Sequence, residues 1–284
     1  MEEKLNILFD TSAINKLSDD SDSAILLAGV KSGYFVRVSG TNLSEVVANP
    51  DEARRQKLLK YLRLLIADGE CLLPHNRIIE LGKKYFERNP QTFNWRGLSI
   101  RFPKAENEIV RQDHINNALA ELQLDQQKVL GKEFEDIFAE MKRKFDLFFE
   151  EEGRPSLHEA RQVCRNEGGS LWAIAVILYG GITSASEETV RNFYKAFPPF
   201  QAQVIALWNA TYYRCVQDTR LGRPSMKSGR LDLMMAVYLP YCDVFVTDDR
   251  AQCRCLKEVA MEANWSVSIQ SYVDFRKGLS GLHL

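Results

Sequence analysis

The sequence predicts an α/β fold: a three-layer α/β/α sandwich with a central parallel sheet, plus a large all-helical insertion. Short apolar runs alternate with helical patterns at both ends of the chain, over residues 1–75 and 228–284. Between them, over residues 76–227, helical patterns follow one another with few β-branched runs. We therefore expect one discontinuous α/β domain, built from residues 1–75 and 228–284 and divided by a helical insertion over residues 76–227.

The N-terminal part supplies the first strands of the expected sheet. Leu5–Phe9 is a short apolar run that ends at Asp10, which is typical of a buried strand that leads into a helix cap. The elements expected next are a helix over Ala24–Val30, a strand over Tyr34–Val38, a helix capped by Thr41 or Ser44, a helix over Asp51–Ala67 and a strand over Cys71–Leu73.

The insertion and the C-terminal part follow the same reasoning. Helices of the insertion are expected over Ile78–Arg88, Lys104–Glu150, Leu157–Val163, Leu171–Leu178, Glu188–Phe197 and Pro199–Asp218. Helices and strands then alternate again, with a helix over Leu231–Tyr238, a strand over Asp243–Thr247, a helix over Gln252–Ala263 and a strand over Trp265–Ile269. The aromatic residues in apolar helical stretches of the insertion are expected to pack in the core: Trp172, Trp208, Tyr212 and Tyr213.

Composition narrows the class of protein. The chain has 284 residues, 45% of them hydrophobic, and a net charge of −1, which excludes a disordered chain and a broad basic face for duplex DNA. No apolar run approaches the roughly 18 residues that span a bilayer, and the N-terminus lacks a signal-peptide pattern. Six cysteines without a CxxC pair favour a reduced, cytoplasmic protein without membrane segments. The four histidines show no ligand spacing and are expected to be structural: His75, His114, His158 and His283.

Five acids stand where a ligand would bind such a fold. Asp10 follows the first expected strand, and Asp248 and Asp249 follow the strand that ends at Thr247. Ligands of parallel α/β sheets bind beyond the carboxyl ends of the strands. Glu45, in the helix after the second strand, and Asp232, near the start of the helix before the fourth, are expected at the same edge.

Such a cluster of carboxylates predicts a divalent metal site. Like charges a few ångströms apart repel and raise one another's pKa. A hard cation removes that cost, and oxygen ligands suit Mg²⁺ or Mn²⁺. The ion can activate water and orient a phosphodiester. An Asp after a strand is often only a helix cap, but four acids in this order, each on a suitable element, favour the metal site.

Four short segments resemble the motifs of PIN-domain nucleases. NILFDTSAINKL is similar to the first motif of that family and TNLSEVV to the second, while DLMMA and FVTDDR resemble the closing motifs. The resemblance covers about residues 4–75 and 228–275. It implies a metal-dependent ribonuclease in which Asp10, Glu45, Asp232 and Asp249 are the catalytic, metal-binding acids.

The resemblance also implies supporting roles. Thr11 and Ser12 match small polar residues that hold the first acid or its metal-bound water, and Thr247 matches a threonine that shapes the rim. Asp248 occupies the variable position of the last motif, where it would join the outer shell of the metal. RNA is the commoner substrate of the family.

The middle of the chain departs from the family. The second and third acids, Glu45 and Asp232, are much farther apart than usual, because the helices of 76–227 have no counterpart. These helices could be a lid, an arm for an inhibitor or partner protein, or a separate subdomain. A basic loop, together with one arginine beside the fourth acid, is a candidate for phosphate contacts: Arg223, Lys227, Arg230 and Arg250.

Two alternatives remain open. The first is a non-catalytic PIN-like scaffold that binds nucleic acid or protein, although retention of all four acids argues against it. The second is a phosphatase similar to the haloacid dehalogenases, which also place an Asp after the first strand. That class has a second acid two residues later, where this chain has Ser12.

Overall fold

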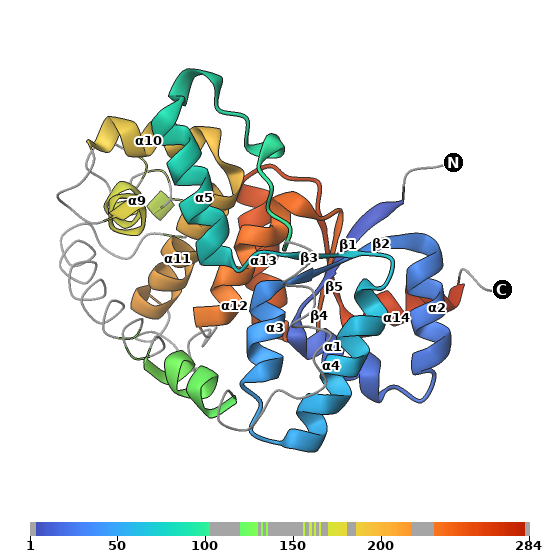
Figure 1. Ribbon diagram of the computed structural model, residues 1–284. Coiled ribbons are helices and arrows are strands. Elements are labelled where there is room, and N and C mark those ends of the chain that lie inside the picture. Colours follow the sequence, from blue (N-terminus) through green and yellow to red (C-terminus); the bar gives the residue numbers. More distant parts are fainter. Residues whose placement is uncertain are drawn as a thin grey trace.

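The computed structural model describes residues 4–102, 120–129, 170–180, 186–216 and 230–281, with single residues between 132 and 165. One parallel sheet forms its centre, in the order β3-β2-β1-β4-β5 (Figure 1). The strands are β1 (Leu5–Phe9), β2 (Tyr34–Ser39), β3 (Glu70–Leu72), β4 (Val244–Thr247) and β5 (Ser268–Ser271). The predicted parallel sheet with flanking helices is therefore confirmed.

The strands bury both faces of the sheet. In β1, Ile7 and Phe9 point to one hydrophobic cluster and Leu8 to the other, and all three are fully buried. Successive side chains of a strand point to opposite faces, so a wholly apolar strand needs helices on both sides. This is why the first apolar run of the sequence predicted a central strand.

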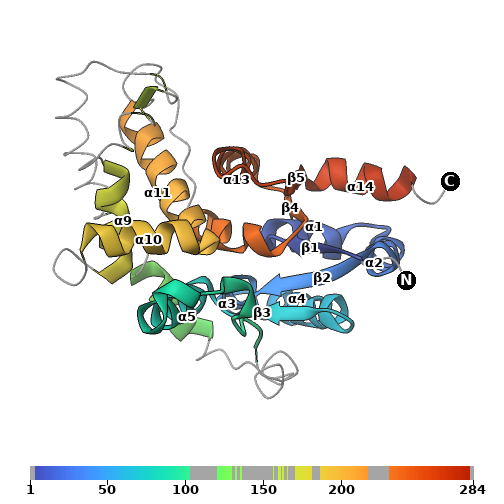
Figure 2. The same ribbon diagram turned by 90° about the horizontal axis from the view of Figure 1, so that it is seen from above.

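The N-terminal helices and the last helix cover the first face. Their cluster includes Ile7, Phe9 and residues of α1 (Thr11–Asp19), α2 (Ser23–Gly33), α3 (Gly40–Val47), α4 (Glu52–Ile66) and α14 (Tyr272–Gly281). Figure 2 shows α2 and α14 on the side of the sheet away from α9, α10 and α11. The sequence did not predict α14.

The described helices of the insertion cover the other face. One cluster joins Leu8 and Leu72 to residues of α5 (His75–Arg88), α9 (Ser170–Gly180), α10 (Glu187–Ala196), α11 (Pro198–Val216) and α13 (Arg250–Glu262). Trp172, Trp208 and Tyr212 are buried in it, as predicted, and the half-buried Tyr213 donates a hydrogen bond to Glu258 at 2.6 Å. These helices thus share the core of the sheet, whereas Lys104–Glu150 and Leu157–Val163 lie largely outside the described residues.

The start of α3 corrects one prediction. Neither Thr41 nor Ser44 caps this helix; Ser39 does. Its hydroxyl accepts a hydrogen bond from the Asn42 N–H at 3.0 Å, and the Asn42 side chain accepts one from the Ser39 N–H at 3.0 Å. This reciprocal pair is a capping box with Asn in the third position. Because it begins at the last residue of β2, the helix starts directly at the edge of the sheet.

Two C-terminal elements also differ from the prediction. The expected helix over Leu231–Tyr238 is α12 (Arg230–Met234) followed by a 3₁₀ helix over Met235–Tyr241. Pro240 has no N–H to donate, so a regular α-helix cannot continue through it. The last strand begins three residues later than expected, at Ser268. Across the described residues, no helix is both long and apolar enough to cross a membrane.

Candidate active site

The centre of the sheet has a switch point. The chain proceeds from β1 to β2 and β3 on one side, and from β4 to β5 on the other, so the connections leave β1 and β4 in opposite directions. Such a point opens a crevice at the carboxyl ends of the strands. Asp10 directly follows β1, and its N–H donates to the Val246 carbonyl of β4 at 2.8 Å. The first predicted acid therefore lies at this crevice.

The Asp10 carboxylate is buried and held by neutral donors. Its side chain is 5% exposed. One oxygen accepts from the N–H of Ser12 at 3.0 Å, from the Ser12 hydroxyl at 2.7 Å and from the Thr247 hydroxyl at 3.4 Å. Asp10 also caps α1, whose N-terminus favours a negative charge. Ser12 and Thr247, predicted as supporting residues, both contact this acid.

Glu45 lies on α3, one helical turn after Asn42. Its carboxylate accepts a hydrogen bond from the Thr11 hydroxyl, and the Thr11 oxygen accepts one from the Asn42 amide at 3.0 Å. Burial raises the pKa of the Glu45 carboxyl to about 8; the charges of Asp10 and Asp232 act in the same direction, against the Thr11 hydrogen bond. The structure thus brings three predicted acids from three elements within electrostatic reach.

Asp232 is joined to Asp10 through an amide. It is half-buried in the first turn of α12, and its Oδ1 accepts a hydrogen bond from the Gln252 Nε2 at 3.4 Å. The same nitrogen donates to the Oδ1 of Asp10 at 3.3 Å. Gln252 is 1% exposed. Its side chain therefore lies between two carboxylates of the predicted site.

Asp249 and Asp248 have different surroundings. Asp249 is exposed and caps α13, where its carboxylate accepts from the N–H groups of Ala251 at 2.7 Å and Gln252 at 2.9 Å. Asp248 forms an ion pair with Lys16 at 3.6 Å. The acids that raise the pKa of Glu45 are Asp10 and Asp232. The structure therefore places Asp10 and Asp232 within electrostatic reach of Glu45, and it places Asp249 at the cap of α13.

The atom types of this cluster suit a hard divalent cation, whereas the positions of the described side chains do not form a metal site. Carboxylate and amide oxygens are the groups that bind Mg²⁺ or Mn²⁺. Among the described residues, however, no group of three or more His, Cys, Asp or Glu is arranged to hold a metal ion.

Two hollows flank Asp248 and both carry basic side chains. The first, of about 290 Å³, is lined by Thr247, Asp248, Asp249, Arg250, Cys253, Arg254, Lys257 and Ser271. The second, of about 450 Å³, is lined by Lys16, Asp20, Asp248, Tyr272, Val273, Arg276 and Lys277. Arg250 was predicted as a phosphate contact; the other basic residues were not, because they are dispersed over α1, α13 and α14.

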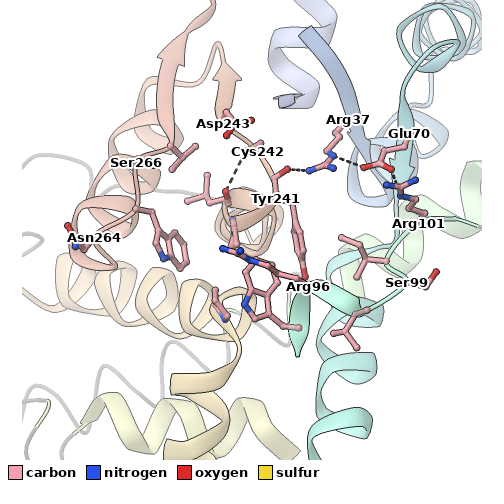
Figure 3. Close-up of a pocket in the computed structure, with 18 residues that line it drawn as sticks. Arg37, Glu70, Arg96, Ser99, Arg101, Tyr241, Cys242, Asp243, Asn264 and Ser266 are labelled. Carbon is pink, nitrogen blue, oxygen red and sulfur yellow. Dashed lines mark hydrogen bonds and ion pairs between the residues drawn. The ribbon is translucent and has the colours of Figure 1, made fainter. Parts of the chain in front are cut away.

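A larger hollow, of about 910 Å³, lies at the opposite edge of the sheet. Figure 3 shows Glu70 between Arg37 and Arg101 in its wall. Arg37 pairs with Glu70 at 2.5 Å and also donates to the Tyr241 carbonyl, while Arg101 forms a second ion pair with Glu70. Glu70 is thus neutralised by two arginines. This hollow contains none of the predicted site residues.

The sequence-based reasoning missed Gln252 and Asn42. Both stand at the third position of a helix, after the caps Asp249 and Ser39. An amide residue at the third position of a helix that carries or follows a predicted acid was the signal that could have identified both residues. Of the predicted basic loop, Arg223 and Lys227 lie outside the described residues, and Arg230 is described only as the first residue of α12.

Comparison of the chain with protein-family models, with curated proteins and with solved structures gave no match. The site is therefore interpreted from its own residues.

Proposed function

We propose that this chain is a metal-dependent nuclease that hydrolyses phosphodiester bonds, with RNA as its substrate. One observation carries the proposal: Asp10, Glu45 and Asp232 meet from three elements at the switch point of the sheet, where burial and the other two acids raise the pKa of Glu45 to about 8. Such an arrangement lowers the stability of the metal-free fold. This loss of stability has a function if the acids bind a cation.

The residues at this edge suit a Mg²⁺ or Mn²⁺ site. Asp10, Glu45 and Asp232 would provide the carboxylate oxygens, with Asp249 as the fourth predicted ligand. When bound, the ion would supply an activated water and offset the negative charge of the phosphate. Ser12 and Thr247 fix the orientation of the Asp10 carboxylate, and Thr11 does the same for Glu45. Such fixed orientation limits the reorganisation that binding requires.

The flanking hollows support an RNA substrate. Arg250, Arg254 and Lys257 are exposed at one end of α13, and all three line the hollow that contains Asp248 and Asp249. Basic side chains hold nucleic acid through its phosphates and so set its register. Because the whole chain has a net charge of −1, this local group is where a strand would bind beside the acids.

We place this activity in the cytoplasm. The four cysteines in the described part of the chain are buried free thiols, which suits a reducing compartment: Cys71, Cys242, Cys253 and Cys255. A partner or inhibitor protein that binds the insertion, one of the roles considered for these helices, remains part of the proposal.

The direct test is incubation of the purified protein with mixed RNAs in Mn²⁺ or Mg²⁺, and again in excess EDTA. We expect cleavage that requires the metal. Asp10→Asn should reduce it by more than about 100-fold, beyond the effect of an outer-shell change, without lowering the unfolding temperature in EDTA, because Asn caps helices as well as Asp does. The control is Asp68→Asn, whose side chain is 83% exposed and pairs with Lys31.

Two results would contradict the proposal. Cleavage that survives excess EDTA would remove the metal-dependent mechanism. If metal-free Asp10→Asn unfolds well below the wild type, Asp10 has a structural role instead. The second candidate is the non-catalytic scaffold, since no group of three or more His, Cys, Asp or Glu among the described residues is arranged to hold a metal ion. RNA binding without cleavage in any metal would establish it.

A further inference from the structure

Gln252 is the one amide that contacts two of the candidate acids among the described residues. It stands at the third position of α13, where its own N–H is held by the cap residue Asp249 at 2.9 Å. Gln252 is 1% exposed, so its side chain is buried among its neighbours and does not face solvent. Its Nε2 donates to Asp10 and to Asp232, at 3.3 and 3.4 Å. The amide is therefore fixed in the middle of the acid cluster.

The other end of this amide is unsatisfied. Within the described residues, Oε1 of Gln252 is buried and has no hydrogen-bond partner. Buried side-chain oxygens of native proteins almost always have one, and leaving one without a partner is costly. The two contacts of Nε2 are also long for N–H hydrogen bonds. The amide thus gains little in this arrangement for the cost of burying both of its polar ends.

The chemistry of a primary amide explains why such a residue would stand here. Carboxylates can only accept hydrogen bonds, so the metal-free pair of Asp10 and Asp232 requires a donor, which the NH₂ group provides. A hard cation requires the opposite, an oxygen, and amide carbonyls are among its common ligands. A half-turn of the amide group exchanges one for the other without moving the helix.

We propose that Gln252 is a further residue of the divalent-metal site: its NH₂ group bridges Asp10 and Asp232 in the metal-free protein, and its carbonyl oxygen faces the ion or an ion-bound water when metal binds. This inference rests on the proposed function, because it assumes that the acids bind a metal. It adds a neutral oxygen donor to the four acids and identifies the contact that holds the acids in place beforehand.

Mn²⁺ binding to three variants tests the inference without RNA. Gln252→Glu has the same shape and always presents oxygen, whereas Gln252→Met has nearly the same length and presents neither donor nor oxygen. The control is Gln270→Glu, which adds the same charge on β5, away from the contacts of Asp10. For each protein, the dissociation constant for Mn²⁺ is measured by calorimetry, and the unfolding temperature is measured in EDTA and in Mn²⁺.

We expect opposite effects from the two substitutions. Gln252→Glu should unfold at a lower temperature than the wild type in EDTA, because a further carboxylate faces Asp10 and Asp232. It should bind Mn²⁺ about 10-fold more tightly, and the ion should raise its unfolding temperature further than it does for the wild type. Gln252→Met should bind Mn²⁺ about 10-fold more weakly. Gln270→Glu should match the wild type in both measurements.

The outcomes separate this inference from the proposed function. Wild-type protein that binds no Mn²⁺ contradicts the proposed function and this inference with it. If the wild type binds Mn²⁺ and Gln252→Met binds it equally well, Gln252 takes no part in the site while the proposed function stands. If Gln252→Met does not fold, the Glu variant decides: Mn²⁺ affinity equal to or below that of the wild type would overturn the assignment of the carbonyl oxygen.

Discussion

Buried acids have different partners at the two ends of the strands, which we call the amino edge and the carboxyl edge of the sheet. At the amino edge, Glu70 is 8% exposed and lies between the guanidinium groups of Arg37 and Arg101 (Figure 3). At the carboxyl edge, Asp10 and Glu45 accept hydrogen bonds from hydroxyl and amide groups, and the charges of Asp10 and Asp232 add to the effect of burial in raising the pKa of Glu45. Among the described residues, the buried acid of the amino edge thus pairs with arginines, whereas Asp10 and Glu45 of the carboxyl edge are hydrogen-bonded to neutral groups.

This difference separates a structural role from a functional one. A buried ion pair needs nothing from outside the protein, because its desolvation cost is offset by its partner. Asp10 and Glu45, which are held by neutral donors, could instead be neutralised by a bound cation that displaces the proton of Glu45. The larger hollow lies at the neutralised edge and the smaller ones beside the acids, so charge rather than volume distinguishes the candidate site.

The largest expected effect is a loss of cleavage, and it tests which of two neighbouring acids at the carboxyl edge belongs to the metal site. Asp249→Asn should reduce metal-dependent cleavage by more than about 100-fold, whereas Asp248→Asn should keep at least about a tenth of it, as an outer-shell residue would. Asn preserves the cap of α13, so the substitution removes charge and leaves the helix. Cleavage rates and Mn²⁺ affinity are measured for both variants.

The reverse ranking would assign the fourth ligand to Asp248, which pairs with Lys16. Equal losses would mean that both carboxylates face the metal. Full activity of Asp249→Asn would reduce this residue to the helix cap that the structure gives it, and would leave Asp10, Glu45 and Asp232 as the only acids of the site.

The next effect tests the neutralised edge. Arg37→Met should destabilise the fold by about 3 kcal/mol, because removing one partner of a buried pair leaves an uncompensated charge. Glu70 would keep Arg101, whose side chain is 67% exposed and therefore a weaker partner. Urea unfolding in EDTA measures the change, and the cleavage rate of the folded fraction should stay at the wild-type value.

The control for this variant is Arg96→Met. Arg96 is exposed in the same hollow and stacks over Trp95 at 5.6 Å from the ring centroid. We expect a change within about 0.5 kcal/mol, as for other surface substitutions. A stable Arg37→Met variant that has lost cleavage would contradict the division of the two edges into structural and functional parts.

Much of the fold and half of the site could be predicted from the sequence, for a physical reason. A strand buried on both faces must be apolar throughout, and Leu5–Phe9 was predicted with its observed bounds. Asp10 could be placed because it follows a strand directly, and Glu45 because it lies in the first turns of the helix after the second strand. Gln252 could not, because its role depends on the approach of α12 and α13, and an isolated glutamine has no motif.

Local hydrogen bonds account for the other differences. The cap of α3 was assigned to Thr41 or Ser44 because both are good caps, but the reciprocal bonds between Ser39 and Asn42 decide in favour of Ser39. Thr41 is instead engaged with the Tyr238 hydroxyl at 3.0 Å. The residue that caps the helix is thus the one that lies at the end of the strand, and a propensity scale for single residues does not contain that information.

The smallest expected effect is a pH dependence of the unfolding free energy, which should arise from Glu45 at the carboxyl edge. In EDTA, the folded-state pKa of Glu45 is raised to about 8 from an ordinary value of 4.5. The folded state therefore holds a proton that the unfolded state releases between these values. The stability that this proton contributes is fully present below about pH 4.5 and is lost as the pH rises through about 8.

We therefore expect the metal-free wild type to lose on the order of 2 kcal/mol of unfolding free energy between about pH 5.5 and about pH 8, since one pKa unit corresponds to about 1.4 kcal/mol and Glu45 is only partly shielded from solvent. Glu45→Gln cannot ionise and should flatten this dependence, whereas Glu80→Gln, whose carboxylate is 61% exposed on α5, should not. Because other titrating groups are common to all three proteins, the difference between their urea curves isolates Glu45. Saturating Mn²⁺ should also flatten the wild-type dependence, because metal binding displaces the proton. Parallel curves for the wild type and Glu45→Gln in EDTA would mean that neither burial nor the other acids raise the pKa of Glu45, and the contrast between the two edges would then fail.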